Sequence, residues 1–260
     1  LCDDAALADV AVVNTCGFIE SAKQESIDEI LELATLKKEG RIKKLVVTGC
    51  LAERYREEIH KELPEVDGML GTGSYTDVAS AVAELMEGER PEHFGDIHRT
   101  YEDGERMVTT PPYTAYLKIA EGCSNGCAFC IIPKLRGRYR SRSMEALLAE
   151  ARQLADSGVK ELIVIAQDIT RYGMDLEEPT SLAGLLKELC KLDFHWIRLH
   201  YLYPEVITDE LIDTIAREKK IVHYLDIPIQ HCNDGILKAM RRRNTRAELE
   251  DLFDLSLIHI

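Results

Sequence analysis

The sequence lacks the features of a membrane-spanning or exported chain. No run of about 18 apolar residues occurs, which argues against a transmembrane helix. The first residues do not combine positive charge, an apolar stretch and small residues, as a secretory signal would. We therefore expect a cytosolic protein with no membrane partner.

Basic residues are outnumbered by acidic ones. The 260 residues include 32 Lys and Arg against 46 Asp and Glu, which gives a formal net charge of −14. Because nucleic-acid binding relies on Lys and Arg that neutralise phosphates, this balance argues against a general nucleic-acid binder. The basic residues that stand out run from Lys134 to Arg142, where the pattern fits either a phosphate-tracking loop or a solvated surface.

Cysteine, in contrast, is well represented, with 8 residues. Disulfide frameworks belong to short secreted chains, so clustered cysteines here indicate metal binding or thiol chemistry. Cys123, Cys127 and Cys130 form a CxxxCxxC loop in which Gly122 and Gly126 allow tight turns. A 4Fe-4S cluster normally takes four thiolates, so three in one loop leave one iron open. The alternative is a zinc site, although zinc sites usually add a second cysteine pair and none follows.

Hydrophobic periodicity predicts alternating strands and helices in the first part of the chain. Strands are expected at 8–18, 44–50 and 66–70, and helices at 21–39, 53–63 and 75–86. This alternation predicts a parallel sheet covered on both faces. Cys16 and Cys50 come at the carboxyl ends of the first two strands, where open α/β sheets place their ligands.

The second part of the chain repeats the alternation after a charged, Gly- and Pro-containing segment at 89–112, which is predicted to be a linker. Strands are expected at 113–120, 160–166, 196–201 and 222–229, and helices at 143–156, 181–191, 208–218 and from 234. Four βα units in a row predict a partial (β/α) barrel with its site at the carboxyl ends of the strands. The fold class is therefore α/β, with domains at 1–88 and 113–260.

The cysteine loop, placed after the first strand of a βα series, resembles that of the radical S-adenosylmethionine (SAM) superfamily. Within that superfamily, the segments Asn-Thr-Cys-Gly-Phe-Ile at 14–19, Val-Thr-Gly-Cys-Leu-Ala-Glu-Arg at 47–54 and Ile-Pro-Lys-Leu-Arg-Gly at 132–137 resemble the methylthiotransferases. Ile-Ala-Gln-Asp at 165–168 and Leu-Asp-Ile-Pro-Ile-Gln-His at 225–231 are similar to the RimO type, which modifies an aspartate of a small-subunit ribosomal protein.

The resemblance implies two 4Fe-4S clusters. Cys123, Cys127 and Cys130 would hold the cluster that binds SAM, while Cys16 and Cys50 would be two of three ligands of an auxiliary cluster. In the family the third ligand lies near the amino terminus, upstream of this chain's first residue, and the segment around Cys2 does not resemble that motif. We expect the chain to be a fragment lacking both ends.

The reaction implied by the resemblance begins with SAM cleavage to a 5′-deoxyadenosyl radical, which takes hydrogen from the aspartate β-carbon. Sulfur would arrive by way of the auxiliary cluster, and a second SAM would supply the methyl group. Gln167, Asp168 and Arg198 are expected to contact SAM, and no residue is assigned as catalytic. The implied partners are the ribosomal protein and an electron donor, with RNA contact only in the ribosomal context.

Two other functions compete with this interpretation. One is methylthiolation of a tRNA adenosine by the related tRNA-modifying type. The other is a non-catalytic electron carrier or cluster scaffold, although a carrier would ordinarily saturate its cluster with four cysteines. Cys190, on an apolar helix face, and Cys232 are expected to be inert thiols.

Overall fold

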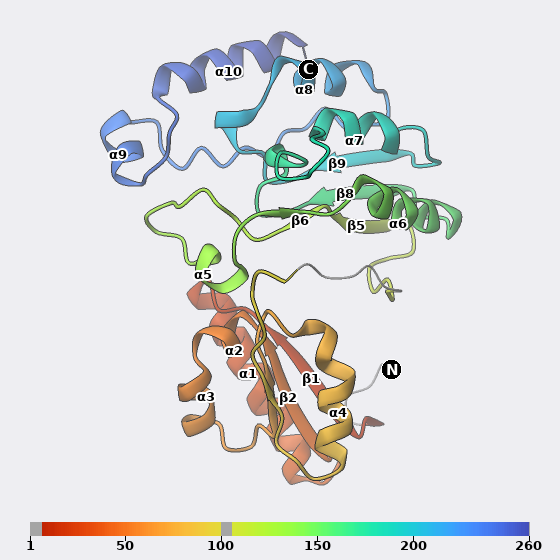
Figure 1. The fold of residues 1–260 in the computed structure, drawn as a ribbon, viewed down its shortest axis with the longest axis vertical. Helices are drawn as coiled ribbons and strands as arrows, with labels where there is room; N and C mark the ends of the chain where they lie inside the picture. The colour runs from red at the N-terminus through yellow and green to blue at the C-terminus, as the bar shows by residue number, and fades with distance from the viewer. Residues whose placement is uncertain (1–6, 100–105, 260) are drawn as a thin grey trace. The chain divides into compact units, whose positions relative to one another are not determined.

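The computed structural model describes residues 7–99 and 106–259, so Cys2 lies outside the described residues. The chain divides into two compact units (Figure 1). The first takes the described residues up to 99 together with Ile131–Gly137, and the second takes 106–130 and 138–259. The domain limits at 88 and 112 stay a prediction. The segment 131–137 belongs to the first unit although it lies beyond both limits in the sequence. No helix among the described residues is long and apolar enough to cross a membrane.

The first unit is built on a four-stranded sheet in the order β1-β2-β3-β4, parallel throughout. Its strands are β1 (Val10–Thr15), β2 (Lys44–Gly49), β3 (Gly68–Leu70) and β4 (Glu92–His93). Its helices are α1 (Glu20–Lys38), α2 (Cys50–Arg54), α3 (Arg56–Glu62), α4 (Val78–Met86) and α5 (Ile132–Arg136), with the 3-10 turn η2 (Tyr75–Asp77). Strand β4 falls inside the predicted linker. Its two residues are too few to show the alternation of apolar and polar residues by which a strand is recognised in a sequence.

Strand β2 shows why this sheet carries helices on both faces. Its apolar residues are consecutive, so alternate side chains point to opposite faces. Leu45 and Val47 belong to the apolar cluster that includes Ile30 and Leu33 of α1, whereas Val46 packs with a separate cluster on α4. Figure 1 shows α1 and α4 on opposite sides of the strands. The predicted α/β fold with a parallel sheet is confirmed.

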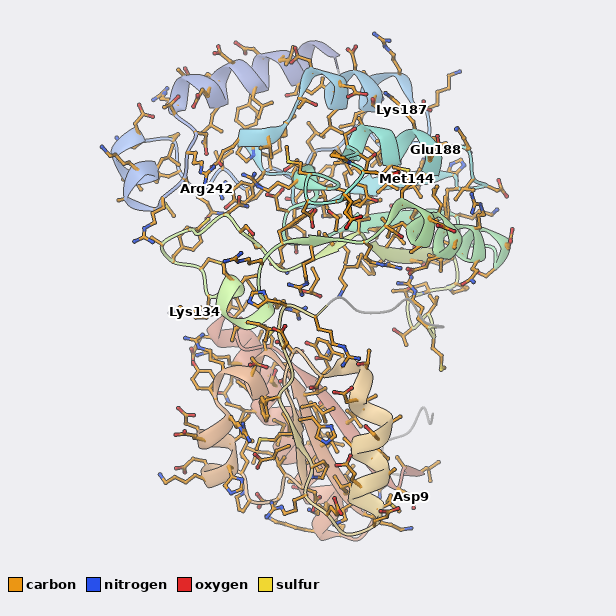
Figure 2. All side chains as sticks on the ribbon, in the orientation of Figure 1. Asp9, Lys134, Met144, Lys187, Glu188 and Arg242 are labelled. Atoms are coloured by element: carbon orange, nitrogen blue, oxygen red, sulfur yellow. The ribbon has the colours of Figure 1, made fainter. Side chains whose placement is uncertain are left out.

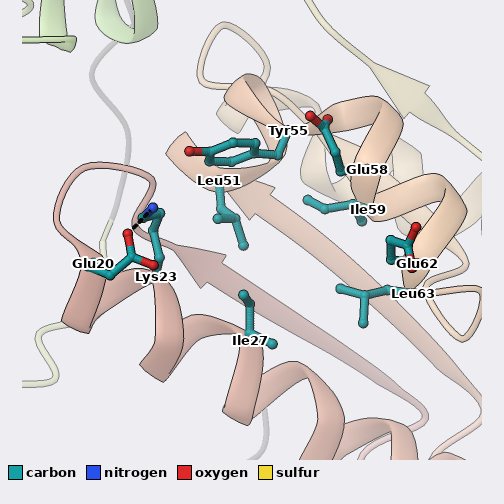
Figure 3. A pocket seen from close by; sticks show the side chains of 9 residues that line it. All are labelled: Glu20, Lys23, Ile27, Leu51, Tyr55, Glu58, Ile59, Glu62 and Leu63. Atoms are coloured by element: carbon teal, nitrogen blue, oxygen red, sulfur yellow. Dashed lines mark ion pairs between the residues drawn. The ribbon is translucent and has the colours of Figure 1, made fainter.

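The predicted helix at 53–63 is broken at Tyr55, whose backbone (φ −124°, ψ 38°) separates α2 from α3. The break leaves an apolar groove of about 360 Å³ beside α1 (Figure 3). The groove is lined by Glu20, Lys23, Ile27, Leu51, Tyr55, Glu58, Ile59, Glu62 and Leu63. Lys23 pairs with Glu20 and also lies 5.7 Å from the centre of the Tyr55 ring, so the charged rim of the groove is partly neutralised.

The second unit contains a parallel sheet in the order β5-β8-β9 and a small antiparallel pair, β6 and β7. Its strands are β5 (Thr114–Lys118), β6 (Ala120–Glu121), β7 (Arg140–Ser141), β8 (Glu161–Ile165) and β9 (Trp196–Leu199). Its helices are α6 (Met144–Asp156), α7 (Leu182–Leu189), α8 (Asp209–Arg217), α9 (Asp234–Ala239) and α10 (Arg246–His259), with the 3-10 turns η3 (Ile169–Arg171) and η4 (Pro204–Val206). This sheet has the parallel order expected of a partial barrel.

Helix starts in the second unit follow sequence rules. The side chains of Ser143, Ser181, Thr208 and Asn233 each accept a hydrogen bond from a backbone N–H in the first turn of α6, α7, α8 and α9. Such capping satisfies donors that the helix itself leaves unpaired. Leu147, Ala151 and Leu154 of α6 are buried in the core of the unit, as the periodicity of that helix predicts.

The fourth predicted strand of the barrel, 222–229, does not form a strand. A single bridge joins Ile221 to Ile197 of β9. After it the backbone bonds are scattered and form no ladder: Asp226 accepts from Leu202, while Tyr224 bonds locally to Val222 and Ile229 to Ile227. Pro228 has no N–H to give to a ladder. The segment therefore lies at the sheet edge as a loop, and the prediction of a strand there was wrong.

Truncating Ile30 to alanine should destabilise the first unit, because this side chain is fully buried between α1 and the sheet. The expected loss in the free energy of unfolding is about 2–5 kcal/mol. Leu31→Ala, one residue along the same helix but 47% exposed, is the matched control and should change it by less than about 0.5 kcal/mol. Urea unfolding followed by circular dichroism would measure both, and equal midpoints would contradict the assigned core.

Candidate functional site

The CxxxCxxC loop begins directly after β6 and turns through two glycines. Gly122 and Gly126 have φ values of 72° and 68°, a conformation that side chains with a Cβ rarely adopt. The backbone N–H of Ala128 donates to the carbonyl of Met240 at 3.0 Å, which ties the loop to the end of α9. Cys123 is buried, and Cys127 and Cys130 are half-buried.

Burial raises the pKa of the Cys123 thiol. The cluster-free chain therefore keeps this thiol protonated at neutral pH, and a metal that bound it would displace the proton.

Cys127 is held by two residues from elsewhere in the second unit. Its sulfur lies 2.6 Å from the Tyr203 hydroxyl, and Nη1 of Arg242 lies 3.9 Å away. The Arg242 guanidinium, labelled in Figure 2, stacks 3.9 Å from the centre of the Tyr203 ring and donates to the Pro228 carbonyl at 2.6 Å. Burial, and next its contact with Cys127, raise the pKa of Tyr203, so the phenol keeps its proton while its oxygen lies within hydrogen-bond distance of the sulfur.

Asp168 fixes the middle of the cysteine loop. Its side chain is fully buried, and it accepts hydrogen bonds from Asn125 Nδ2 at 2.8 Å, from Arg171 Nε at 3.1 Å, and from the Thr170 backbone and hydroxyl. Arg171 Nε also donates to Asn125 Oδ1 at 2.9 Å. A buried carboxylate is tolerated when it is paired and hydrogen-bonded in this way. Asp168 therefore acts on the loop through Asn125.

The other two residues expected to contact SAM occupy different settings. Gln167 is exposed after β8. Arg198 donates to Glu161, the first residue of β8, at 2.8 Å, so its guanidinium lies toward the amino ends of the strands. The sequence placed all three residues near strand ends, but it did not show which residues would form hydrogen bonds with each side chain.

Replacing Asp168 with alanine should loosen the cysteine loop, because Asn125 and Arg171 would lose a shared acceptor inside the protein. We expect the free energy of unfolding to fall by about 1–3 kcal/mol. Amide hydrogen exchange at residues 123–130 should also become faster. Gln167→Ala, the exposed neighbour, should leave both measurements unchanged, and unaltered exchange in Asp168→Ala would contradict this role.

The second group of cysteines lies at one edge of the first unit's sheet. Cys16 and Cys50 directly follow Thr15 and Gly49, which are paired in the register of β1 and β2. A Cβ built at Gly17 would lie 2.5 Å from the Cys50 carbonyl oxygen, so the turn after Cys16 packs against the backbone of Cys50. The Cys16 N–H donates to the Ser26 hydroxyl at 3.0 Å. The edge position predicted for both cysteines is therefore the one the structure has.

A basic side chain that the sequence did not connect with this site approaches Cys50. Arg136 of α5 donates from Nε to the Cys50 sulfur at 3.3 Å. In the sequence Arg136 belongs to the basic stretch that follows the CxxxCxxC loop, and no spacing rule links it to Cys50. The contact exists because 131–137 packs with the first unit.

The donor chemistry of these cysteines fits iron–sulfur clusters. Among the residues that the structure describes, no three His, Cys, Asp or Glu side chains are placed to bind one metal ion. In a cubane cluster each thiolate binds a different iron, so its ligands do not converge on one atom. Three thiols on one glycine-turned loop match the three ligands of a cluster with an open iron, and the first unit provides two.

Cys190 has the features of an inert core thiol. Burial, and secondarily Glu218, raise its pKa to about 12. Because the thiolate is the reactive form, a raised pKa keeps Cys190 unreactive until the pH nears that value.

Iodoacetamide should therefore label Cys190 slowly between about pH 7 and 10, with a rate that still rises at the upper limit. The exposed Cys232 is the reference thiol and should be labelled first throughout this range. Peptide mass spectrometry would measure both rates. Equal labelling rates of Cys190 and Cys232 at the lower end of this pH range would contradict the burial of Cys190.

Comparison with known families gives two matches along the chain. The Radical SAM superfamily matches residues 117–256, which cover the cysteine loop and most of the sheet of the second unit. The Uncharacterized protein family UPF0004 matches residues 1–71, which include Cys16 and Cys50.

Curated relatives match almost the whole chain. The Ribosomal protein uS12 methylthiotransferase RimO of Clostridioides difficile is 54% identical over 250 residues, covering 95% of this chain and 56% of that protein. The protein of the same name from Geotalea uraniireducens is 55% identical over 249 residues, covering 94% and 55% respectively. The resemblance to the RimO type is thereby confirmed. The chain spans little more than half the length of these relatives.

Solved structures share the fold at low sequence identity. The radical SAM methyltransferase TsrM from Kitasatospora setae superimposes with a TM-score of 0.67 and 13% identity, covering 97% of this chain and 55% of its own. The cobalamin-dependent SAM radical enzyme OxsB gives a TM-score of 0.60 at 14% identity, covering 95% and 38%. At such identities the likeness concerns the fold alone.

Proposed function

Because the chain belongs to the radical SAM superfamily, we propose that it forms part of a methylthiotransferase acting on ribosomal protein uS12. The reaction is addition of a methylthio group to the β-carbon of an aspartate of that protein. The observation that carries this proposal is the CxxxCxxC loop after β6, in a chain more than 50% identical to uS12 methylthiotransferases over nearly its full length.

Two cysteine groups are assigned to two 4Fe-4S clusters. Cys123, Cys127 and Cys130 would hold the cluster whose fourth iron is open to SAM. Cys16 and Cys50 would be two of the three ligands of an auxiliary cluster. When bound, the first cluster would pass an electron from the donor to SAM, which is the source of the radical, and the auxiliary cluster would supply sulfur.

The chain's own residues position these ligands. The Tyr203 hydroxyl contacts the Cys127 sulfur, and Arg242 supplies positive charge beside it. Asp168 holds the loop through Asn125. Gln167, Asp168 and Arg198 stay predicted contacts of SAM, and Asp168 in addition positions the loop.

The remaining assignments follow from the same proposal. The partners are uS12 and an electron donor, with RNA contact only in the ribosomal context, which agrees with the net charge of −14. A cytosolic location is part of the proposal, since ribosomal proteins and reduced thiols are found there. The domains proposed are 1–88 and 113–260.

Anaerobic reconstitution tests the cluster assignment. The chain should gain roughly four more irons and sulfides than a variant carrying Cys123→Ala, Cys127→Ala and Cys130→Ala. SAM should change the electron paramagnetic resonance spectrum of the reduced chain and be cleaved to 5′-deoxyadenosine, whereas the triple variant should do neither. Cys190→Ala, which removes a thiol outside both groups, is the matched control and should behave like the parent.

Other outcomes would favour the competing functions. A cluster that binds but ignores SAM would favour an electron carrier or scaffold. To separate the two methylthiolation substrates, a protein that contains this sequence and has the full length of its relatives should be assayed with uS12 and with tRNA, each analysed by mass spectrometry. A methylthio group on a tRNA adenosine, with uS12 unchanged, would replace the proposed substrate.

A further inference from the structure

The contact between Arg136 and Cys50 joins a permanent positive charge to a buried sulfur. The guanidinium Nε donates to the Cys50 sulfur at 3.3 Å, and Cys50 is only 4% exposed. With so little water at the sulfur, both the hydrogen bond and the charge act with reduced screening. Arg136 therefore stabilises negative charge on this sulfur more strongly than a surface arginine would.

Helix α5 is anchored so that Arg136 is held in place. Ile132 and Leu135 of α5 are buried, and the Leu135 carbonyl accepts a hydrogen bond from the Thr72 hydroxyl. The Thr72 backbone N–H in turn donates to the Glu53 carboxylate of α2 at 2.9 Å. Helix α2 begins at Cys50, so the same short segment carries the sulfur and part of the anchor for α5.

The backbone around Cys50 is equally constrained. Gly17 lies so close to the Cys50 carbonyl that a Cβ there would clash, and the Gly17 carbonyl accepts from Arg54 Nη1 at 2.9 Å. The Cys50 sulfur and the Arg136 guanidinium therefore belong to two segments, α2 and α5, that are each held by other contacts. Preorganised donors of this kind need little rearrangement when charge appears on their acceptor.

We propose that Arg136 is a positioning residue for Cys50 that raises the reduction potential of the cluster bound there. Hydrogen bonds to cluster sulfurs and nearby positive charge favour the reduced, more negative state. The inference rests on the proposed auxiliary cluster. Because Arg136 closely follows Cys130 in the sequence while it packs with the first unit, the stretch after the CxxxCxxC loop serves the auxiliary site.

The contact itself is tested without any cluster. In nitrogen-15 NMR spectra of the cluster-free chain, the Arg136 Nε–H signal, identified by its loss in Arg136→Lys, should shift in Cys50→Ser. It should stay in place in Lys134→Gln, which removes an exposed charge from the same helix. An Arg136 signal that is insensitive to Cys50→Ser would overturn the assigned contact.

The effect on the cluster is tested by a redox titration. The chain carrying Cys123→Ala, Cys127→Ala and Cys130→Ala would be reconstituted with iron, sulfide and 2-mercaptoethanol as an additional thiol ligand. Its midpoint potential would then be followed by electron paramagnetic resonance. Arg136→Gln should shift the potential to a lower value, and Arg136→Lys should lie between Arg136→Gln and the parent, because lysine keeps the charge but loses the planar donor. Lys134→Gln should match the parent.

The two levels of the proposal fail in different ways. If iron binds and the potential of Arg136→Gln equals that of the parent, the role of Arg136 is overturned while the auxiliary cluster stands. If the parent binds no iron through Cys16 and Cys50, as judged by comparison with Cys16→Ala and Cys50→Ala, the auxiliary cluster is overturned and the inference with it.

Discussion

Parallel pairing of β1 with β2 is the constraint on which the first cysteine site depends. Thr15 lies opposite Gly49 in this register, so the chain leaves both strands at the same edge and the next residues are Cys16 and Cys50. The carboxyl ends of parallel strands lie at the same edge of the sheet, so residues far apart in the sequence come together there. The consecutive apolar residues of β2, packed on both faces, keep the register from slipping.

The second unit reaches a similar result by a different means. Its cysteine loop has no strand to fix it after β6, and polar contacts take that role. A buried carboxylate at Asp168 anchors Asn125, and Tyr203 with Arg242 holds Cys127. Such a network tolerates the loss of a member poorly, because the remaining polar groups stay buried without partners. The loop is therefore held by side-chain contacts at Asn125 and Cys127, and its two glycines adopt positive φ.

Both cysteine groups are accompanied by arginine. Arg242 lies near Cys127 and Arg136 near Cys50, although the chain as a whole is acidic. A guanidinium keeps its charge at every accessible pH and is less strongly hydrated than an ammonium, which suits it to half-buried sites beside sulfur. Cys127 and Cys50 therefore each have a positive charge beside them in a protein whose net charge is negative.

The sequence by itself determined the α/β class, the parallel sheets, most helices and the cysteines that form the candidate sites. These follow from periodicity and spacing, which are local properties. Tertiary structure alone decided that 222–229 stays a loop, that Asp168 holds Asn125, and that Arg136 and Arg242 reach sulfurs far away in the sequence. Those contacts depend on which segments pack together, because a polar or charged side chain can contact a residue far away in the sequence only where tertiary packing places the two side by side.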